Sequence, residues 1–465
     1  MIRVLVVQAI GNWILTEPET FRRFLINRMY SSRSTLAALI LACSLAGSIS
    51  ASEPVEGPPL LFSNQVIPEE LRAGERFEVA PVCHVVNFGY EFRLNTDWGV
   101  YEVRGLDMLR KRIHEIAAME KLEEVGKTKA FATSFSEALK DPVVNTWSVA
   151  KRPIKTVRGI PGGIMRYLKG KFYEVKRGSE KVAAKAKFKR NVEKTESEPT
   201  TVPQKVTGTA KRVGSTTRKL GRRHLGFEKA KRAWSRRLKV DPYTTNEYLQ
   251  VELERIAWAS SVGSFAGEFA IPSNAALSYA LQAQEMVWTQ SPTELERRNF
   301  NALSDMGVDH SALLVFNDLD HYTLSEKTLL VLALESLEVD GRLDLVRLLL
   351  EIESRDEAML VVKIVSALGN YHRLIEPIAE ISIRRGMATA NLESGRMILP
   401  LALDYLHWEP AIAEALLSDE LQSDSRTLLI EGTASAIAKR RLKEASWNLE
   451  ESSSEQFAKL EEKIL

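Results

Sequence analysis

The stretch Thr323-Leu-Ser-Glu-Lys-Thr-Leu-Leu-Val-Leu-Ala-Leu-Glu-Ser-Leu337 decides the fold class, because a helix start signal is followed at once by an apolar stripe. The Thr323 hydroxyl can accept a hydrogen bond from the third amide ahead, while the Glu326 side chain reaches back to the Thr323 amide. The leucines that follow recur at helical intervals. The stretch therefore predicts an amphipathic helix that packs into a core.

Similar start signals flank this stretch on both sides. They begin at Thr244, Ser291 and Ser354, each with a Glu three residues later. Apolar stripes of helical spacing follow over 343–350 and 359–368. With short turns between them, these helices predict a C-terminal domain over 241–445, built as a helical-hairpin bundle or a solenoid-like array. A small hairpin around Glu393-Ser-Gly395 interrupts this pattern, and residues 446–465 are expected to be a charged tail.

The region before the helical domain has a different sequence pattern. Residues 77–86 are rich in β-branched residues, and two alternating runs flank the turn-forming cluster Asn95-Thr-Asp-Trp-Gly99, which predicts a hairpin. Helical spacing returns over 106–125 and 129–139. We therefore predict a small α/β domain over 73–140, preceded by a flexible arm over 52–72. The fold class is mainly α, and α+β overall.

Charge is segregated along the chain. The formal net charge is only +2, yet residues 140–239 contain 29 Lys and Arg against 7 Asp and Glu, a net of +22. Such a run attracts an anionic surface or polymer even where salt screens charges over about 8–10 Å. We therefore predict a basic linker over 141–240. It is expected to be partly disordered, because its second half has too few large apolar residues to offset the entropy of ordering.

The first part of the basic linker mixes aromatic and aliphatic residues with cations, as in segments that lie on an anionic membrane face. The residues predicted to contact such a surface are Lys151, Arg152, Lys155, Arg158, Arg166, Tyr167, Lys169, Lys171 and Phe172. An acidic protein is the other partner that this charge allows, and a solvated linker without a partner is the plain alternative. Nucleic acid suits the charge but not an exported chain.

Residues 29–51 have the three parts of a secretory leader. Arg33 supplies a positive charge, an apolar run covers Leu36 to Leu45, and small residues lead to Ala51. The apolar run is too short to span a bilayer. We therefore predict cleavage after Ala51 and a mature chain that is periplasmic or exported, with a peripheral membrane location as one possibility.

Two further expectations concern the start of the chain. Translation from Met29 would make residues 1–28 a mis-called start. Ile40-Leu-Ala-Cys43 loosely resembles a lipoprotein processing box, so lipidation at Cys43 is the minor alternative to cleavage. Once the leader is removed, only Cys83 remains, which excludes an internal disulfide and a zinc site of several thiolates.

Asp309-His310 and Asp320-His321 form the cluster with the most suggestive chemistry. Carboxylates and imidazoles bind zinc and similar ions, so a metal-dependent or acid–base hydrolase that uses this region is an alternative function. The plainer interpretation places Asp320, together with the nearby Asp318, in a polar loop before the Thr323 cap. We expect no metal and no cofactor, and we regard an enzyme as the less favoured interpretation.

The C-terminal pattern resembles a group of exported proteobacterial proteins that has no assigned activity. The residues that carry the resemblance are Gly307-Val-Asp309, the helical run after it, and Asp404-Tyr-Leu406 followed by Trp408. The resemblance covers about 80–180 and 290–415. It implies export, and it brings no catalytic residues.

These patterns together predict an exported, non-enzymatic cell-envelope protein. Its helical interaction domain would be joined to a basic segment that docks on an anionic membrane surface or an acidic partner. A nucleic-acid-binding protein is the alternative if residues 29–51 are not a signal.

Overall fold

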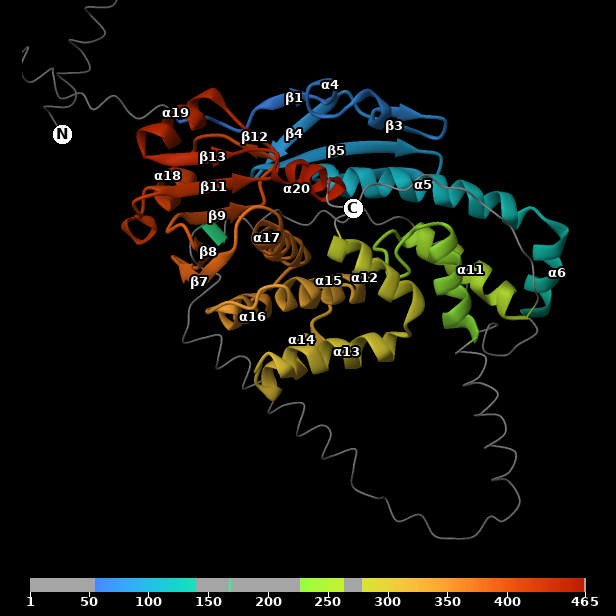
Figure 1. The fold of residues 1–465 in the computed structure, drawn as a ribbon. Coiled ribbons are helices and arrows are strands. Elements are labelled where there is room, and N and C mark those ends of the chain that lie inside the picture. Colours follow the sequence, from blue (N-terminus) through green and yellow to red (C-terminus); the bar gives the residue numbers. More distant parts are fainter. Residues whose placement is uncertain (1–54, 139–166, 169–225, 263–277, 464–465) are drawn as a thin grey trace, which may run out of the picture. The chain divides into compact units, whose positions relative to one another are not determined.

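The computed structural model describes residues 55–138, 167–168, 226–262 and 278–463 (Figure 1). Helices and two principal sheets, one antiparallel and one mixed, make these residues an α+β structure. The described residues from Glu56 onward belong to one unit. None of the described helices is long and apolar enough to cross a lipid bilayer.

The first sheet is antiparallel and follows the order β1-β4-β5-β3-β2, with β6 paired to the other edge of β5. The predicted hairpin around Asn95–Gly99 is confirmed, because β5 and β6 pair on either side of it. The predicted run 77–86 is divided into two strands at Pro81, whose missing amide hydrogen interrupts a ladder. The strands are β1 (Leu60–Phe62), β2 (Ala73–Gly74), β3 (Phe77–Val79), β4 (Val82–Val86), β5 (Gly89–Thr96) and β6 (Gly99–Arg104).

The stretch expected to be a flexible arm, 52–72, is ordered where it is described. It holds β1, the short helix α4 (Ser63–Val66) and the 3-10 turn η1 (Glu69–Leu71). Composition missed this, because the stabilising contacts come from residues far away in the chain. The Ser63 hydroxyl donates to the Ala80 carbonyl at 2.5 Å. Glu56 accepts hydrogen bonds from the Trp408 amide at 2.7 Å and the Ser435 hydroxyl at 2.5 Å.

The helices predicted after the first sheet are confirmed as α5 (Leu106–Gly126) and α6 (Lys129–Ala138). The apolar stripe of α5 is buried against the sheet and against α11 (Glu247–Val262). Residues 226–237, at the end of the predicted basic linker, are also helical. Trp234 from this helix is 2% exposed, and its indole donates to the Ser260 hydroxyl at 2.7 Å.

The helical region continues as predicted. Both start signals at Ser291 and Thr323 form complete capping boxes, and Ser354 caps its helix through the Glu357 amide. The start signal predicted at Thr244 begins two residues later. Asn246, and not Thr244, accepts a hydrogen bond from the Leu249 amide at the start of α11. The helices are α12 (Ser278–Thr289), α13 (Pro292–Asp305), α14 (His310–Asp318), α15 (Leu324–Glu335), α16 (Arg342–Leu350) and α17 (Arg355–Leu374).

The second sheet corrects the expectation of helices up to residue 445 and of a charged tail beyond it. Its order is β13-β11-β9-β8-β7, where β9, β11 and β13 are parallel and β7, β8 and β9 are antiparallel. The hairpin predicted around Glu393–Gly395 is confirmed as the β8–β9 turn. The strands are β7 (Ile378–Arg384), β8 (Met387–Leu392), β9 (Met397–Leu401), β11 (Arg426–Ile430) and β13 (Trp447–Glu450).

The error has a physical cause. Every residue of β9 and β11 is buried, and a strand buried on both faces reads as a continuous apolar run without alternation. In the supposed tail, Trp447 and Phe457 are buried. The remaining elements are α18 (Pro410–Leu416), η2 (Asp419–Leu421), α19 (Ala436–Glu444) and α20 (Ser453–Glu462), together with the short parallel pair β10 (Tyr405–Leu406) and β12 (Thr433–Ala434).

Two residues from the first third of the basic linker belong to the hydrophobic core around the second sheet, here named the second core; the core around the first sheet is named the first core. Tyr167 is 0% and Leu168 is 1% exposed, and both belong to the cluster that includes the second sheet. The fragment lies beside β8 (Figure 1). The Tyr167 hydroxyl accepts a hydrogen bond of 2.7 Å from the Ala388 amide of β8. Residues 167–168, here named the linker anchor, therefore attach the linker to the sheet.

The linker anchor is expected to stabilise the fold measurably. Tyr167→Phe removes the acceptor for a buried amide, which should lower the free energy of unfolding by about 1–3 kcal/mol. Tyr243→Phe is the matched control, because the Tyr243 hydroxyl is buried with no hydrogen-bond partner among the described residues. Chemical denaturation of the three proteins tests this, and equal losses in both variants would contradict the assignment.

Candidate functional site

The tip of the β4–β5 hairpin enters the second core. Phe88 is 0% exposed and belongs to that core, whereas its neighbours Val85 and Tyr90 belong to the first. Its ring centre lies 4.7 Å from that of His407. The Phe88 carbonyl accepts from the amides of Asp404 and Tyr405, both at 3.0 Å. The hairpin tip therefore joins the two sheets through side-chain and backbone contacts.

Four charged side chains, Asp107, Lys363, Asp404 and Glu431, gather beside this tip and are here named the ionic junction. The Lys363 ammonium pairs with Glu431 and lies 3.6 Å from Asp107 Oδ2. Asp404 Oδ2 accepts a 2.8 Å hydrogen bond from the Tyr90 amide. Asp404 and Glu431 follow the carboxyl ends of β9 and β11, while Lys363 lies on α17 and Asp107 in the first turn of α5.

Two glycines permit this close packing. Gly105, which precedes α5, has a φ of +82°, and a Cβ there would lie 3.6 Å from Asp404 Oδ2. A Cβ on Gly432 would lie 1.8 Å from the Asp404 carbonyl oxygen, which is a severe clash. The loop that carries Asp404 is thus confined from both sides.

Burial controls the protonation of the ionic junction. Burial raises the pKa of Asp404, against the opposing effects of Lys363 and the Tyr90 amide. Burial also raises the pKa of Glu431 to about 7, against the attraction of the Lys363 ammonium and with smaller contributions from Asp107 and Asp404. Burial would lower the pKa of Lys363, but the three carboxylates raise it above its ordinary value. Glu431 therefore exchanges a proton near neutral pH while Lys363 stays charged.

The position of the ionic junction is that of a ligand site in many α/β folds, where ligands bind outside the carboxyl ends of parallel strands. Two carboxyls of raised pKa beside a lysine are also suitable groups for acid–base chemistry. Here, however, the chain's own Phe88 and the start of β5 occupy this edge, and Asp404 is only 8% exposed. The arrangement is therefore suited to holding two sheets together rather than to receiving a substrate.

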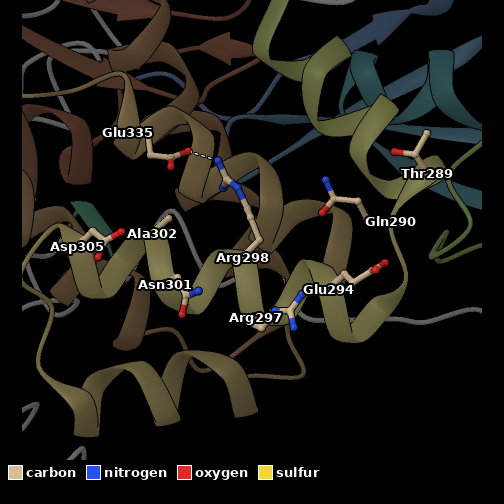
Figure 2. Close-up of a pocket in the computed structure, with 9 residues that line it drawn as sticks. All are labelled: Thr289, Gln290, Glu294, Arg297, Arg298, Asn301, Ala302, Asp305 and Glu335. Carbon is tan, nitrogen blue, oxygen red and sulfur yellow. Dashed lines mark hydrogen bonds and ion pairs between the residues drawn. The ribbon is translucent and has the colours of Figure 1, made fainter.

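A separate open trough of about 640 Å³ lies among α12, α13 and α15 (Figure 2). All of its lining side chains except Ala302 are polar. The Arg298 guanidinium spans it to pair with Glu335, while Gln290 and Asn301 present amides. Because the trough offers both hydrogen-bond donors and acceptors, it suits contact with a polar segment of another molecule better than contact with an apolar ligand.

The structure does not bring Asp309-His310 and Asp320-His321 together. The two pairs flank α14, whose nine residues span roughly 13 Å at 1.5 Å per residue. Asp309 caps the helix by accepting from the Ser311 amide at 2.9 Å, and the Ser311 hydroxyl and amide lower its pKa. The His310 ring packs edge-on against Phe300.

The second pair is open to solvent. The Asp320 side chain is 93% exposed, and His321 Nδ1 lies 3.9 Å from Asp320 Oδ1. Within the described ranges, no group of three His, Cys, Asp or Glu side chains is placed to hold a metal ion. Each of the four residues thus has a local role as a cap, a packed ring or a solvated side chain.

Of the residues predicted to contact a membrane, the structure describes only Tyr167, which is buried in the linker anchor instead of facing outward. The other eight, Lys151, Arg152, Lys155, Arg158, Arg166, Lys169, Lys171 and Phe172, lie outside the described residues. Tyr167 is therefore removed from the set of surface contacts.

Sequence reasoning missed the ionic junction, although two signals were present. Lys363 interrupts the apolar stripe 359–368, and Glu431 ends the apolar run 428–430. A charge inside an apolar pattern indicates a buried, paired group. The partners could not be identified, because Asp107 and Lys363 are separated by most of the chain.

Comparison with known proteins finds no matching family model, no matching curated protein and no matching solved structure. The interpretation of these sites therefore depends on their own geometry and charge.

The ionic junction should make stability depend on pH. The folded-state pKa of Glu431 is about 7 against an ordinary value of 4.5, so between these values the folded state binds more protons. The free energy of unfolding should therefore fall as the pH rises through this window, by about 3 kcal/mol from this group. Glu431→Gln should remove that part of the decline in denaturation measurements. Glu414→Gln, an exposed position, should keep it, and an unchanged slope in Glu431→Gln would contradict the assignment.

The exposed pair should be dispensable for folding and for metal content. Asp320→Ala combined with His321→Ala should change the free energy of unfolding by no more than about 0.5 kcal/mol, as is usual for surface substitutions. The metal content of the purified protein should not change. Loss of a bound ion in the double variant would revive the hydrolase alternative.

Proposed function

We propose that the protein is an exported, non-enzymatic cell-envelope protein that docks on an anionic membrane surface through its basic linker. In this proposal the chain consists of the α+β region up to about residue 140, the basic linker, and a C-terminal region that acts as an interaction domain. The export step rests on the leader-like residues 29–51.

The linker anchor is the observation that carries this proposal. Arg166 and Lys169 are bonded directly to its two buried residues, and consecutive Cα atoms lie only about 3.8 Å apart. In the sequence, the attachment point therefore has a cation directly on each side. The linker anchor thus attaches a strongly cationic segment to the folded core at Tyr167. Each Lys or Arg held near an anionic bilayer contributes about 1 kcal/mol.

Two features of the folded part support binding over catalysis. The chain's own hairpin tip occupies the carboxyl edge of the parallel strands, where a substrate would bind. The polar trough beside Arg298 offers a surface on which a partner could lie, and it gives the helical region a role as an interaction domain.

Vesicle flotation tests the docking step. The full mature chain should float with vesicles of mixed phosphatidylcholine and phosphatidylglycerol, and it should be released by high salt. Gln substitutions at Lys151, Arg152, Lys155 and Arg158 should weaken binding by about 4 kcal/mol, or roughly a thousandfold. The matched control carries Gln at the exposed positions Arg440, Lys443, Lys459 and Lys463 and should bind as the parent does.

Several outcomes would contradict docking on lipid. Equal flotation with pure phosphatidylcholine would remove the electrostatic argument. Binding to an acidic protein without binding to anionic vesicles would replace the membrane with that partner.

Fractionation of cells that express a tagged chain tests the compartment. A mature N-terminus near Ser52 in the periplasm would support export. A cytoplasmic chain with an intact leader would overturn it, and nucleic acid would become the partner to test.

A further inference from the structure

A second pocket, independent of the basic linker, lies where the β5–β6 turn meets α5 and α11. Its volume is about 310 Å³, at the lower end of the range for small-molecule sites. It is here named the Trp98 pocket, and the residues that line it are Arg76, Asp97, Trp98, Met119, Glu123, Tyr248, Glu252 and Arg255. Three separate parts of the chain build it.

The wall from the first sheet is held by its own hydrogen bonds. The Trp98 amide donates to the Thr96 hydroxyl at 3.1 Å, and that hydroxyl donates to the Gly99 carbonyl at 2.8 Å. The Arg76 guanidinium lies 4.5 Å from the centre of the Trp98 ring and donates to Asp97 at 2.7 Å. The indole is therefore already positioned in the free protein, which lowers the entropy cost of binding.

The opposite wall belongs to α11. Tyr248 and Glu252 are four residues apart and so share a helix face, and the ring centres of Tyr248 and Trp98 are 6.0 Å apart. Arg255 lies 3.2 Å from Glu252 and reaches past Gly126, where a Cβ would lie 2.4 Å from Arg255 Nη2. The glycine thus leaves room for this guanidinium beside the pocket.

The charges around the pocket nearly cancel. Three carboxylates, on Asp97, Glu123 and Glu252, face two guanidiniums, and Lys127 pairs with Glu123 at 3.0 Å. The pocket therefore has little net field to select an anion or a cation. What it offers is hydrogen-bonding capacity, since a carboxylate accepts at up to four positions and a guanidinium has five N–H groups.

Glu252 is the pocket residue with the most unused capacity to accept hydrogen bonds. Its side chain is only 14% exposed, and among the described residues Arg255 is the one side chain that pairs with it. Burial raises its pKa, against the attraction of Arg255 and with a contribution from Glu123. A ligand hydroxyl that donates to this carboxylate would supply the stabilisation that burial removed.

We propose that the Trp98 pocket binds one ring of a neutral saccharide. Such a ring has an apolar C–H face that packs on aromatic side chains, and two aromatic residues, Trp98 and Tyr248, line the pocket. Its neighbouring hydroxyls both donate and accept, which matches alternating carboxylates and guanidiniums. The Glu252 carboxylate accepts from the sugar hydroxyls, and the guanidiniums of Arg76 and Arg255 donate to them. This binding site does not depend on membrane docking.

Isothermal titration calorimetry on the full mature chain tests the proposal. The probes are glucose, galactose, N-acetylglucosamine and their common disaccharides, with N-acetyl-lysine methylamide as a cationic probe and acetate as an anionic one. We expect saturable binding of at least one saccharide and of neither ion. Glu252→Gln should weaken that binding about tenfold or more, since a hydrogen bond to a charged group is lost.

The control is Glu254→Gln, on the same helix but outside the pocket, where Glu254 pairs with Lys231. It should bind the saccharide as the parent does. Trp98→Ala provides a second loss variant that tests the aromatic wall. A thermal melt establishes that each variant is folded. The absence of saccharide binding by the parent, or binding of the cationic probe that depends on Glu252, would overturn the proposal.

Discussion

The arrangement of the two sheets depends on the insertion of Phe88 into the second core. The hydrogen bonds between the Phe88 carbonyl and the Asp404 loop are part of the same contact. Both turn residues, Asn87 and Phe88, have positive φ. That conformation is costly for a phenylalanine and persists only where the surroundings enforce it. The side chain enters the apolar core while the backbone satisfies two amides, so one residue provides both kinds of contact.

The ionic junction follows from this insertion. Once the hairpin tip covers the carboxyl edge of the second sheet, Asp404 and Glu431 lose most of their contact with water. Lys363 and the Tyr90 amide then become the main compensation for buried charge. A single ammonium among three carboxylates leaves an excess of negative charge, and a carboxyl that binds a proton near neutrality relieves it. The carboxyl edge of the second sheet is thus covered, and the ionic junction that lies there is sensitive to pH.

With that edge closed, the surfaces that remain for recognition lie elsewhere. The polar trough beside Arg298 and the Trp98 pocket are both lined by charged groups that already pair with one another. The linker anchor adds a third element, because it attaches a strongly cationic segment to the folded core at Tyr167. These features are distributed over separate elements of the fold.

The sequence by itself determined the local structure. Capping boxes at Ser291 and Thr323, the hairpin around Asn95–Gly99 and the stripe of α5 were all readable, because the interactions involved are a few residues apart. The sequence did not reveal β11, because a strand buried on both faces loses its alternation, and β13 lies in a stretch that was expected to be a charged tail. Only the tertiary structure decided which charges are buried and which aromatic residues line pockets. Asp404 and Tyr90, or Trp98 and Tyr248, are distant in the chain and meet only when long-range packing brings their elements together.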